Sequence, residues 1–159
     1  GSRLWGYSIM VTENYMTIEF PAIPENVEFA RTVVACFASQ ISSFTLEEID
    51  DIKLVVSEAV SNTVLHSYDT PGGIIRLTAA RNGDTLYVTV EDFGKGITEI
   101  EKAKEPAFTT DPDRMGMGFT IMEALSDELH VTSVPGKGVK VEIRKSPHGT
   151  AKASEELQC

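Results

Sequence analysis

Hydrophobic and polar positions near the start of the chain follow two different periods, and each period predicts one element. Residues 16–22 alternate between apolar and polar side chains, which is typical of a half-buried strand. After Pro24, residues 27–41 carry apolar side chains at the three- and four-residue spacing of an amphipathic helix. The sequence therefore predicts a strand that leads into a helix.

A second helix is predicted from a well-marked start. Thr45 and Glu48 have the spacing of a capping box, and Phe44 and Ile49 are placed to pack as a hydrophobic staple. The helical pattern continues to about residue 67, beyond which proline and glycine end it.

Two β-hairpins are predicted later in the chain. The first joins the alternating runs 74–80 and 85–91 through the Asn-Gly pair at 82–83, which is the strongest short hairpin signal. The second joins 129–134 and 139–143 through a proline and glycines. Both hairpins would add antiparallel strands to one sheet.

These elements together indicate an α+β fold. A short helix at 119–125 lies between the hairpins, so the order is strand, two helices, hairpin, long loop, helix, hairpin. Because helices and strands are segregated along the chain, we expect a two-layer α/β sandwich. The helices would cover one face of a mostly antiparallel or mixed sheet.

Length and composition allow one ordinary domain. The chain has 159 residues, of which 42% are hydrophobic, which is enough for one core but not for two. We expect that domain to span 16–145. Residues 1–15 are interpreted as a partly cloning-derived leader, with the natural start at Met10 or Met16, and 146–159 as a flexible polar tail.

The charge balance is strongly acidic. The chain has 24 Asp and Glu residues against 14 Lys and Arg residues, and its formal net charge of −10 argues against nonspecific nucleic-acid binding. An anionic ligand would have to be held locally by backbone N–H groups, a metal ion or a few basic residues. Cys36 and Cys159 belong to no metal-binding motif, and neither a membrane-length apolar run nor a signal peptide is visible, so a cytoplasmic protein is expected.

Three polar side chains, Glu58, Asn62 and His66, recur at every fourth position in an otherwise apolar part of the second predicted helix. On a helix they form one polar stripe that should lie against the protein body. A carboxylate there could accept a proton, and an amide oxygen one turn away could hold Mg²⁺. The alternative for Glu58 is a structural ion pair, and for His66 a structural role is favoured over a catalytic one.

Two glycine-containing segments follow in a long stretch that is rich in Gly, Pro, Asp and Thr. Asp92 closes a predicted strand just before Gly94 and Gly96, and its carboxylate could accept a hydrogen bond from an amine such as that of adenine. Gly116 and Gly118 are expected just before or within the first turn of a helix, where unpaired N–H groups could seat phosphate. Taken alone, the first segment is more typical of a plain turn, and the second could be a flexible hinge.

Taken in order, the polar stripe and the two glycine segments resemble the ATP-binding fold shared by gyrase, the Hsp90 chaperone, histidine kinases and the mismatch-repair protein MutL. Within that group, segments 56–62, 108–110 and 116–123 are similar to the anti-sigma serine kinases of spore-forming bacteria. The resemblance implies a homodimer that binds ATP and Mg²⁺. It would hold a sporulation sigma factor, sigma F, when ATP is bound, and would phosphorylate a serine on an anti-anti-sigma factor.

The resemblance also implies roles for individual residues. Glu58 would be the general base on the substrate serine, Asn62 the Mg²⁺ ligand and Asp92 the group that reads the adenine amine. Phosphoryl transfer asks a protein mainly to position groups and to offset charge, which suits this set. Further nucleotide contacts would come from the glycine segments, the lid loop and the last hairpin: Gly94, Gly96, Thr109, Thr110, Arg114, Gly116, Met117, Gly118, Phe119 and Val139.

The chain departs from these relatives at two places. Where they usually carry a threonine after the last glycine pair, this chain has Val139 and Lys140, and its stretch at 110–116 is shorter. Val139 shares strand parity with Val141 and Ile143, so it should face the core as an apolar contact to the base. Three alternatives stay open: an anti-sigma module for a stress sigma factor, a nucleotide-switched binder without kinase activity, and a stand-alone ATPase.

Overall fold

The computed structural model describes residues 3–4, 7–8, 12–66, 73–93, 112–134 and 138–148. Side chains are described at 12–65, 73–93, 118–133 and 138–148. Within these ranges the chain forms a five-stranded sheet covered by helices, and a separate pair of two-residue strands.

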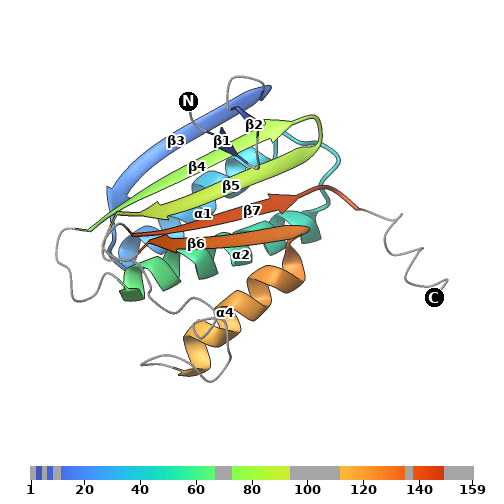
Figure 1. Cartoon of the computed structure of the whole chain (residues 1–159). Helices are drawn as coiled ribbons and strands as arrows, with labels where there is room; N and C mark the ends of the chain where they lie inside the picture. The colour runs from blue at the N-terminus through green and yellow to red at the C-terminus, as the bar shows by residue number, and fades with distance from the viewer. Residues whose placement is uncertain are drawn as a thin grey trace.

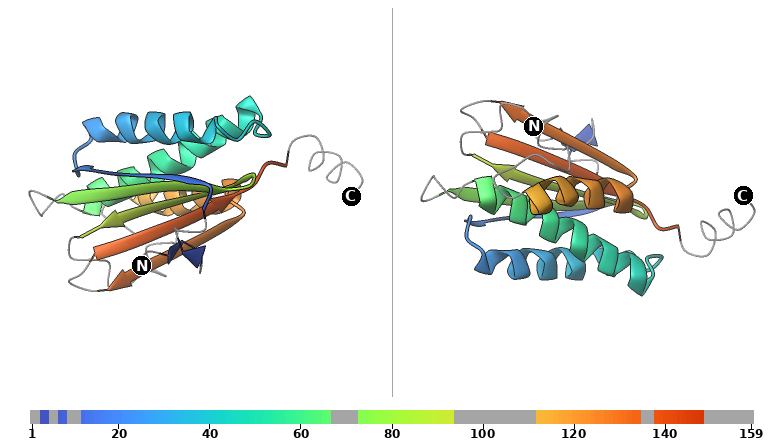
Figure 2. Two further views of the ribbon diagram at one scale, coloured as in Figure 1. Left: turned by 90° about the horizontal axis from the view of Figure 1, so that it is seen from above. Right: turned by 90° about the horizontal axis from the view of Figure 1, so that it is seen from below.

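The five-stranded sheet is antiparallel throughout, with the order β3-β4-β5-β7-β6. Helices α1, α2 and α4 lie on one face of this sheet (Figure 1, Figure 2). This arrangement confirms the predicted α+β two-layer sandwich. The strands are β3 (Asn14–Pro21), β4 (Ile74–Asn82), β5 (Thr85–Asp92), β6 (Glu128–Val134) and β7 (Gly138–Lys145), and the helices are α1 (Glu25–Ala38), α2 (Leu46–His66) and α4 (Pro112–Leu125).

Both predicted hairpins are confirmed. β4 and β5 pair from Asn82 opposite Thr85, with Gly83 in the turn at a φ of 59°, and β6 and β7 pair from Val134 opposite Gly138. The short strands β1 (Arg3–Leu4) and β2 (Tyr7–Ser8) lie in the segment that was interpreted as a leader, and no sequence pattern predicted them.

The predicted start of the second helix is confirmed in its hydrogen bonds. The N–H of Thr45 donates to Glu48 Oε1 at 3.0 Å, and the N–H of Glu48 donates to Thr45 Oγ1 at 3.1 Å. These two bonds satisfy donors that a helix start otherwise leaves unpaired. No helix in the described ranges is both long and apolar enough to cross a membrane.

One hydrophobic core fills the space between the sheet and the helices. Leu86, Val88 and Val90 of the central strand β5 belong to this core. Val139 on β7 is buried in the same core, as its strand parity predicted. Asp92 has the parity of Val90, so the end of β5 turns a carboxylate toward the helical layer.

The opposite face of the sheet carries a row of alternating charges. Glu19, Arg76, Glu91 and Lys140 lie opposite one another on four neighbouring strands, and successive members are 3.7 Å apart. Exposed pairs of this kind contribute about 0–1 kcal/mol each. Their main effect is on register, because a slip of one strand would separate the opposite charges.

Candidate functional site

The candidate site lies where α4 packs against α2. Gly118 of α4 faces Glu58 and Asn62, two members of the polar stripe. A Cβ added at Gly118 would lie 2.9 Å from Glu58 Oε2 and 3.0 Å from Asn62 Nδ2. Both distances are shorter than an unstrained carbon contact, so a side chain at this position would displace its neighbours. The glycine therefore lets the backbone of α4 approach the stripe directly.

Asn62 is buried in this contact without a hydrogen bond. Its side chain is only 3% exposed, yet neither its amide oxygen nor its amide nitrogen has a hydrogen-bond partner in the part of the chain that is described. Leaving a buried amide unpaired costs about 1–3 kcal/mol, so Asn62 is a candidate for binding a ligand. Glu58, one turn earlier, is half-buried and has an interaction of its own.

Asp92 forms a second part of the site at the end of β5. It is 5% exposed, and its neighbours in register are Ile75 on β4 and Val139 on β7, both buried. We call these three residues the Asp92 row. A ligand that lies against the row would meet one hydrogen-bond acceptor between two aliphatic side chains.

Gly138 allows β7 to approach Asp92 at the start of the strand. Its φ is 104°, and an added Cβ would collide with the carbonyl oxygen of Asp92 and lie 3.0 Å from the Cα of Phe93. Glycine alone combines this φ with so close an approach. Sequence reasoning placed Gly138 only in a hairpin turn. The pairing of β5 with β7 in one sheet brings Gly138 next to Asp92, whose partner in register is Val139.

A sequence profile identifies the kind of domain that carries this site. The profile of the histidine kinase-like ATPase domain matches residues 20–145. That range includes α1, α2, α4 and all the site residues described above.

Two relatives that align with this chain over nearly their whole length identify the family more closely. The chain is 48% identical over 135 residues to the anti-sigma F factor of Clostridium acetobutylicum, which covers 84% of this chain and 94% of that protein. It is 49% identical over 134 residues to the anti-sigma F factor of Thermoanaerobacter pseudethanolicus, which covers 83% and 93%. The chain belongs to the anti-sigma F factor family.

The fold of this anti-sigma F family member is also found in solved histidine kinases. The blue-light activated histidine kinase of Erythrobacter litoralis aligns with a TM-score of 0.56 at 25% identity, covering 77% of this chain and 43% of that one. A structure of the histidine kinase domain of the same protein aligns with a TM-score of 0.55 at 24% identity, covering 79% and 63%. The chain therefore spans less than two thirds of either kinase structure.

Within this member of the anti-sigma F family, the structure brings together two groups of predicted site residues. Gly118 meets Glu58 and Asn62, and Val139 lies beside Asp92. Phe119 is buried in the hydrophobic core directly after the Gly118 contact. The predicted residues Gly94, Gly96, Thr109 and Thr110 lie outside the described ranges. A second set lies on α2 or α4 at positions where the backbone is described but the side chains are not: His66, Arg114, Gly116 and Met117.

The predicted position of the second glycine segment is wrong. Gly116 and Gly118 were expected just before or within the first turn of a helix, but α4 begins at Pro112 and both glycines lie beyond its first turn. Proline is favoured at the first helical position because it lacks the N–H that would be unpaired there. The unpaired N–H groups belong to the four residues that begin the helix. Gly118 therefore contributes close approach to α2 and not a free N–H at a helix start.

Proposed function

We propose that this chain is an ATP-dependent protein serine kinase that also acts as an anti-sigma factor. The observation that carries the proposal is the contact of Gly118 with Glu58 and with the buried Asn62, in a histidine kinase-like ATPase domain. Phosphoryl transfer needs a proton acceptor, an oxygen ligand for a metal ion and close backbone positioning of the phosphates. Glu58 can supply the proton acceptor and Asn62 the oxygen ligand, while Gly118 lets the backbone of α4 lie directly against both side chains.

Glu58 is proposed as the general base. Its carboxylate takes the proton of the acceptor serine hydroxyl while that oxygen attacks the γ-phosphorus of ATP. The bond between the γ-phosphorus and the bridging oxygen breaks, and its electron pair leaves with ADP. The products are phosphoserine and ADP, and the proton on Glu58 is then released to water.

Asn62 is proposed to hold the Mg²⁺ that accompanies the nucleotide. Mg²⁺ prefers oxygen ligands and usually shares its shell between one or two protein groups, substrate phosphates and water. No cluster of three His, Cys, Asp or Glu among the described residues could hold a metal ion by itself. The ligand that we propose is the buried amide oxygen of Asn62, which has no hydrogen-bond partner within the described ranges. When bound there, the ion would offset the negative charge of the nucleotide phosphates.

The Asp92 row is proposed to hold the base, together with the predicted contacts outside the described residues. The carboxylate of Asp92 would accept a hydrogen bond from the 6-amino group of adenine, while Ile75 and Val139 contact the ring. A 6-oxo purine presents an acceptor where adenine presents a donor, so ATP should bind in preference to GTP.

The anti-sigma role is proposed from the relatives, which carry the name anti-sigma F factor. We expect a homodimer that binds a sporulation sigma factor of this kind, sigma F, more tightly with ATP than with ADP. Such a switch requires only that the two nucleotide states differ in affinity for the partner. The acceptor of the phosphate would be an anti-anti-sigma factor.

The test is incubation with γ-labelled ATP, Mg²⁺ and purified anti-anti-sigma protein from the same host. Label on one serine of the acceptor supports the kinase. Absence of label, from a sample that binds ATP, overturns it. ATP-dependent capture of the sigma factor without any transfer would leave a nucleotide-switched binder, and steady phosphate release without either partner would identify an ATPase.

Asn62→Ala separates a metal ligand from a structural asparagine. We expect the Mg²⁺ concentration for half-maximal transfer to rise about 10–100-fold, as for lost metal-site groups. The melting temperature without nucleotide should not fall, because the amide has no hydrogen-bond partner within the described ranges. Asn26→Ala is the matched control: it removes a 2.9 Å hydrogen bond to the Pro21 carbonyl and should lower stability without changing the Mg²⁺ requirement. An unchanged Mg²⁺ requirement in Asn62→Ala would exclude the ligand role.

A further inference from the structure

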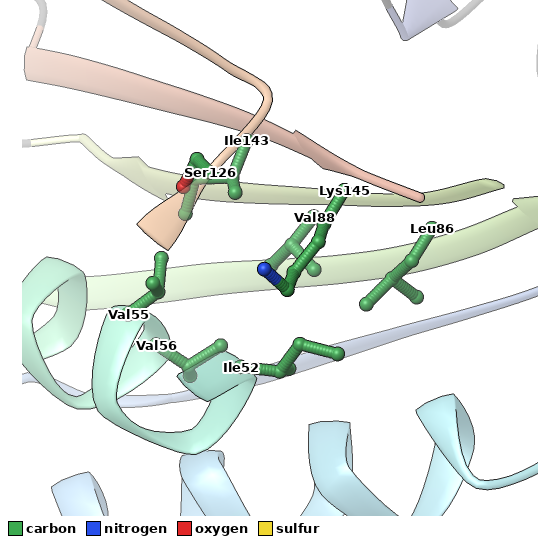
Figure 3. Close-up of a pocket in the computed structure, with 8 residues that line it drawn as sticks. All are labelled: Ile52, Val55, Val56, Leu86, Val88, Ser126, Ile143 and Lys145. Atoms are coloured by element: carbon green, nitrogen blue, oxygen red, sulfur yellow. The ribbon is translucent and has the colours of Figure 1, made fainter. Parts of the chain in front are cut away.

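The end of β7 is hydrogen-bonded to α4 through a buried lysine. Lys145 is 6% exposed, and its Nζ donates a 2.7 Å hydrogen bond to the carbonyl oxygen of Leu125, the last residue of α4. A cation at this end of a helix offsets the partial negative charge of its unpaired carbonyls. Figure 3 shows Lys145 beside a cavity with mainly apolar walls, whose volume of about 10 Å³ has room for no more than a single water.

Asp127, in the turn after α4, forms hydrogen bonds to the same end of β7 and to the residues that follow it. Its carboxylate accepts 2.7 Å hydrogen bonds from the N–H of Ser146 and from Nε2 of His148, and its own N–H donates to the carbonyl of Arg144 at 2.9 Å. Burial by itself would raise the pKa of Asp127. The hydrogen bonds from His148 and Ser146 and the positive charges of His148 and Lys145 outweigh burial, so the pKa lies below its ordinary value.

The same chain segment reaches the start of α2. The backbone N–H of His148 donates a 2.7 Å hydrogen bond to Glu48 Oε2, while Oε1 of that carboxylate serves the capping box at Thr45. Glu48 is buried, so these bonds are shielded from water. We call residues 145–148 the strap, because they bond to α4, to the turn after it and to α2.

The strap and the Gly118 contact hold α4 against α2 at two separate places. Along α4, Gly118 and Leu125 are seven residues apart, which is about 10 Å. Along α2, Glu48 and Glu58 are ten residues apart, which is about 15 Å. The helices therefore run antiparallel, with the strap joining one pair of ends and Gly118 meeting the polar stripe further along.

We propose that the strap sets the position of α4 relative to α2, and that Lys145 is a positioning residue for the candidate site. Apolar packing of Phe119 and Met122 holds α4 in the core, but the hydrophobic effect is non-directional. A directional hydrogen bond at the helix end removes that freedom. Without it, Gly118 would move away from Glu58 and Asn62. The effect on ATP binding rests on the proposed function, whereas the effect on the helix contact does not.

The test is a double-variant cycle of Lys145→Met with Gly118→Ala, followed by thermal melting without nucleotide. Lys145→Met keeps the apolar stem and removes the ammonium. Residues about 10 Å apart without shared partners normally affect stability additively. If the strap presses α4 onto α2, its removal lets α4 move off the added methyl group. The melting temperature of the double variant should then be higher than the sum of the two single-variant decreases predicts. Strictly additive decreases would overturn the proposal.

Two further variants keep this test interpretable. Lys140→Met is the matched control, because Lys140 lies on the same strand but points to the opposite face, where it pairs with Glu91 at 3.7 Å. It should show no coupling to Gly118→Ala. Should Lys145→Met fail to fold, Asp127→Asn removes a different bond of the strap, and it should couple to Gly118→Ala in the same direction.

The consequence for the site is measured by ATP binding. Lys145→Met should weaken ATP affinity about fivefold. A lower melting temperature with unchanged ATP affinity would reduce the strap to a stabilising contact and overturn the positioning role. If the unmodified protein does not bind ATP, the proposed function fails while the thermal cycle still decides on the strap.

Asp127→Asn should change how stability depends on acid pH. The folded pKa is lowered, so the stabilisation is fully present above the unfolded value of about 4 and is lost as pH falls through the folded value. The groups that face Asp127 are Lys145 and His148, with Glu48 bonded behind His148. We expect Asp127→Asn to destabilise at about pH 7 and the difference to shrink below about pH 4. Urea unfolding at constant ionic strength, repeated over a range of pH, measures the difference in stability between Asp127→Asn and the unmodified protein. A difference that stays constant into strong acid contradicts the prediction.

Discussion

Glu58→Gln is expected to reduce phosphate transfer to the acceptor protein by about 10²–10⁴-fold while ATP still binds. Glutamine keeps the shape of glutamate but cannot take a proton near neutral pH, so the loss would report proton transfer and not packing. Because Glu58 is half-buried beside Gly118, a similar shape also preserves the helix contact.

Single-turnover transfer of labelled phosphate and equilibrium ATP binding measure this result on the same samples. Asp50→Asn is the control, because it makes the same carboxylate-to-amide change at an exposed position of α2 eight residues before Glu58. Transfer that survives in Glu58→Gln would show that another group, or solvent, takes the serine proton. Loss of ATP binding in that variant would instead assign Glu58 to the binding of the nucleotide.

Gly118→Ala is expected to lower transfer about 100-fold, the size of effect that a misplacement of about 1 Å can produce. Two opposing terms act on stability. Replacing a helical glycine by alanine ordinarily stabilises by about 1 kcal/mol, whereas overpacking costs about 1–3 kcal/mol. The clash should win, because the new Cβ would lie 2.9 Å from Glu58 Oε2 and 3.0 Å from the buried Asn62 amide.

Calorimetric melting and labelled transfer measure the two effects of Gly118→Ala separately. Ala124→Gly, at an exposed position of α4, shows how much a methyl group contributes to this helix without the contact. Wild-type transfer together with a raised melting temperature in Gly118→Ala would mean that Glu58 and Asn62 can move aside at no cost. That outcome would remove the structural basis of the proposed active site.

The fold was predictable because its signals are local and agree with one another. The capping box of Thr45 and Glu48 marks the start of α2, and the Asn-Gly pair at 82–83 marks the first hairpin. Strand parity placed Val139 in the core without any knowledge of its neighbours. Each of these patterns depends on residues that lie within a few positions of one another.

The helix before the second hairpin was predicted too short for a physical reason. Glycine costs only about 1 kcal/mol in a helix, and packing against another element can offset that cost. Gly116 and Gly118 were therefore no barrier to a helix that begins at Pro112.

The contacts of Gly118 and Gly138 lay beyond reach of the sequence pattern. Each glycine meets a partner far along the chain, Gly118 at Glu58 and Asn62, and Gly138 at Asp92. Such contacts follow from how helices and strands assemble, and a local period carries no information about them. The strap was missed for the same reason, since His148 and Glu48 are 100 residues apart.

Gly138 also restricts how this protein can diverge over evolution. A side chain at 138 would meet the main chain of Asp92, so no replacement of the Asp92 side chain could compensate for it. Ile75 and Val139, which flank Asp92 in the proposed base site, carry no such restriction, and their aliphatic volume can be exchanged. Gly83 contrasts with Gly138, because a Cβ there meets nothing within 4 Å and its φ of 59° is one that asparagine tolerates. Lineages of this chain are therefore expected to vary at the first hairpin and to keep glycine at the second.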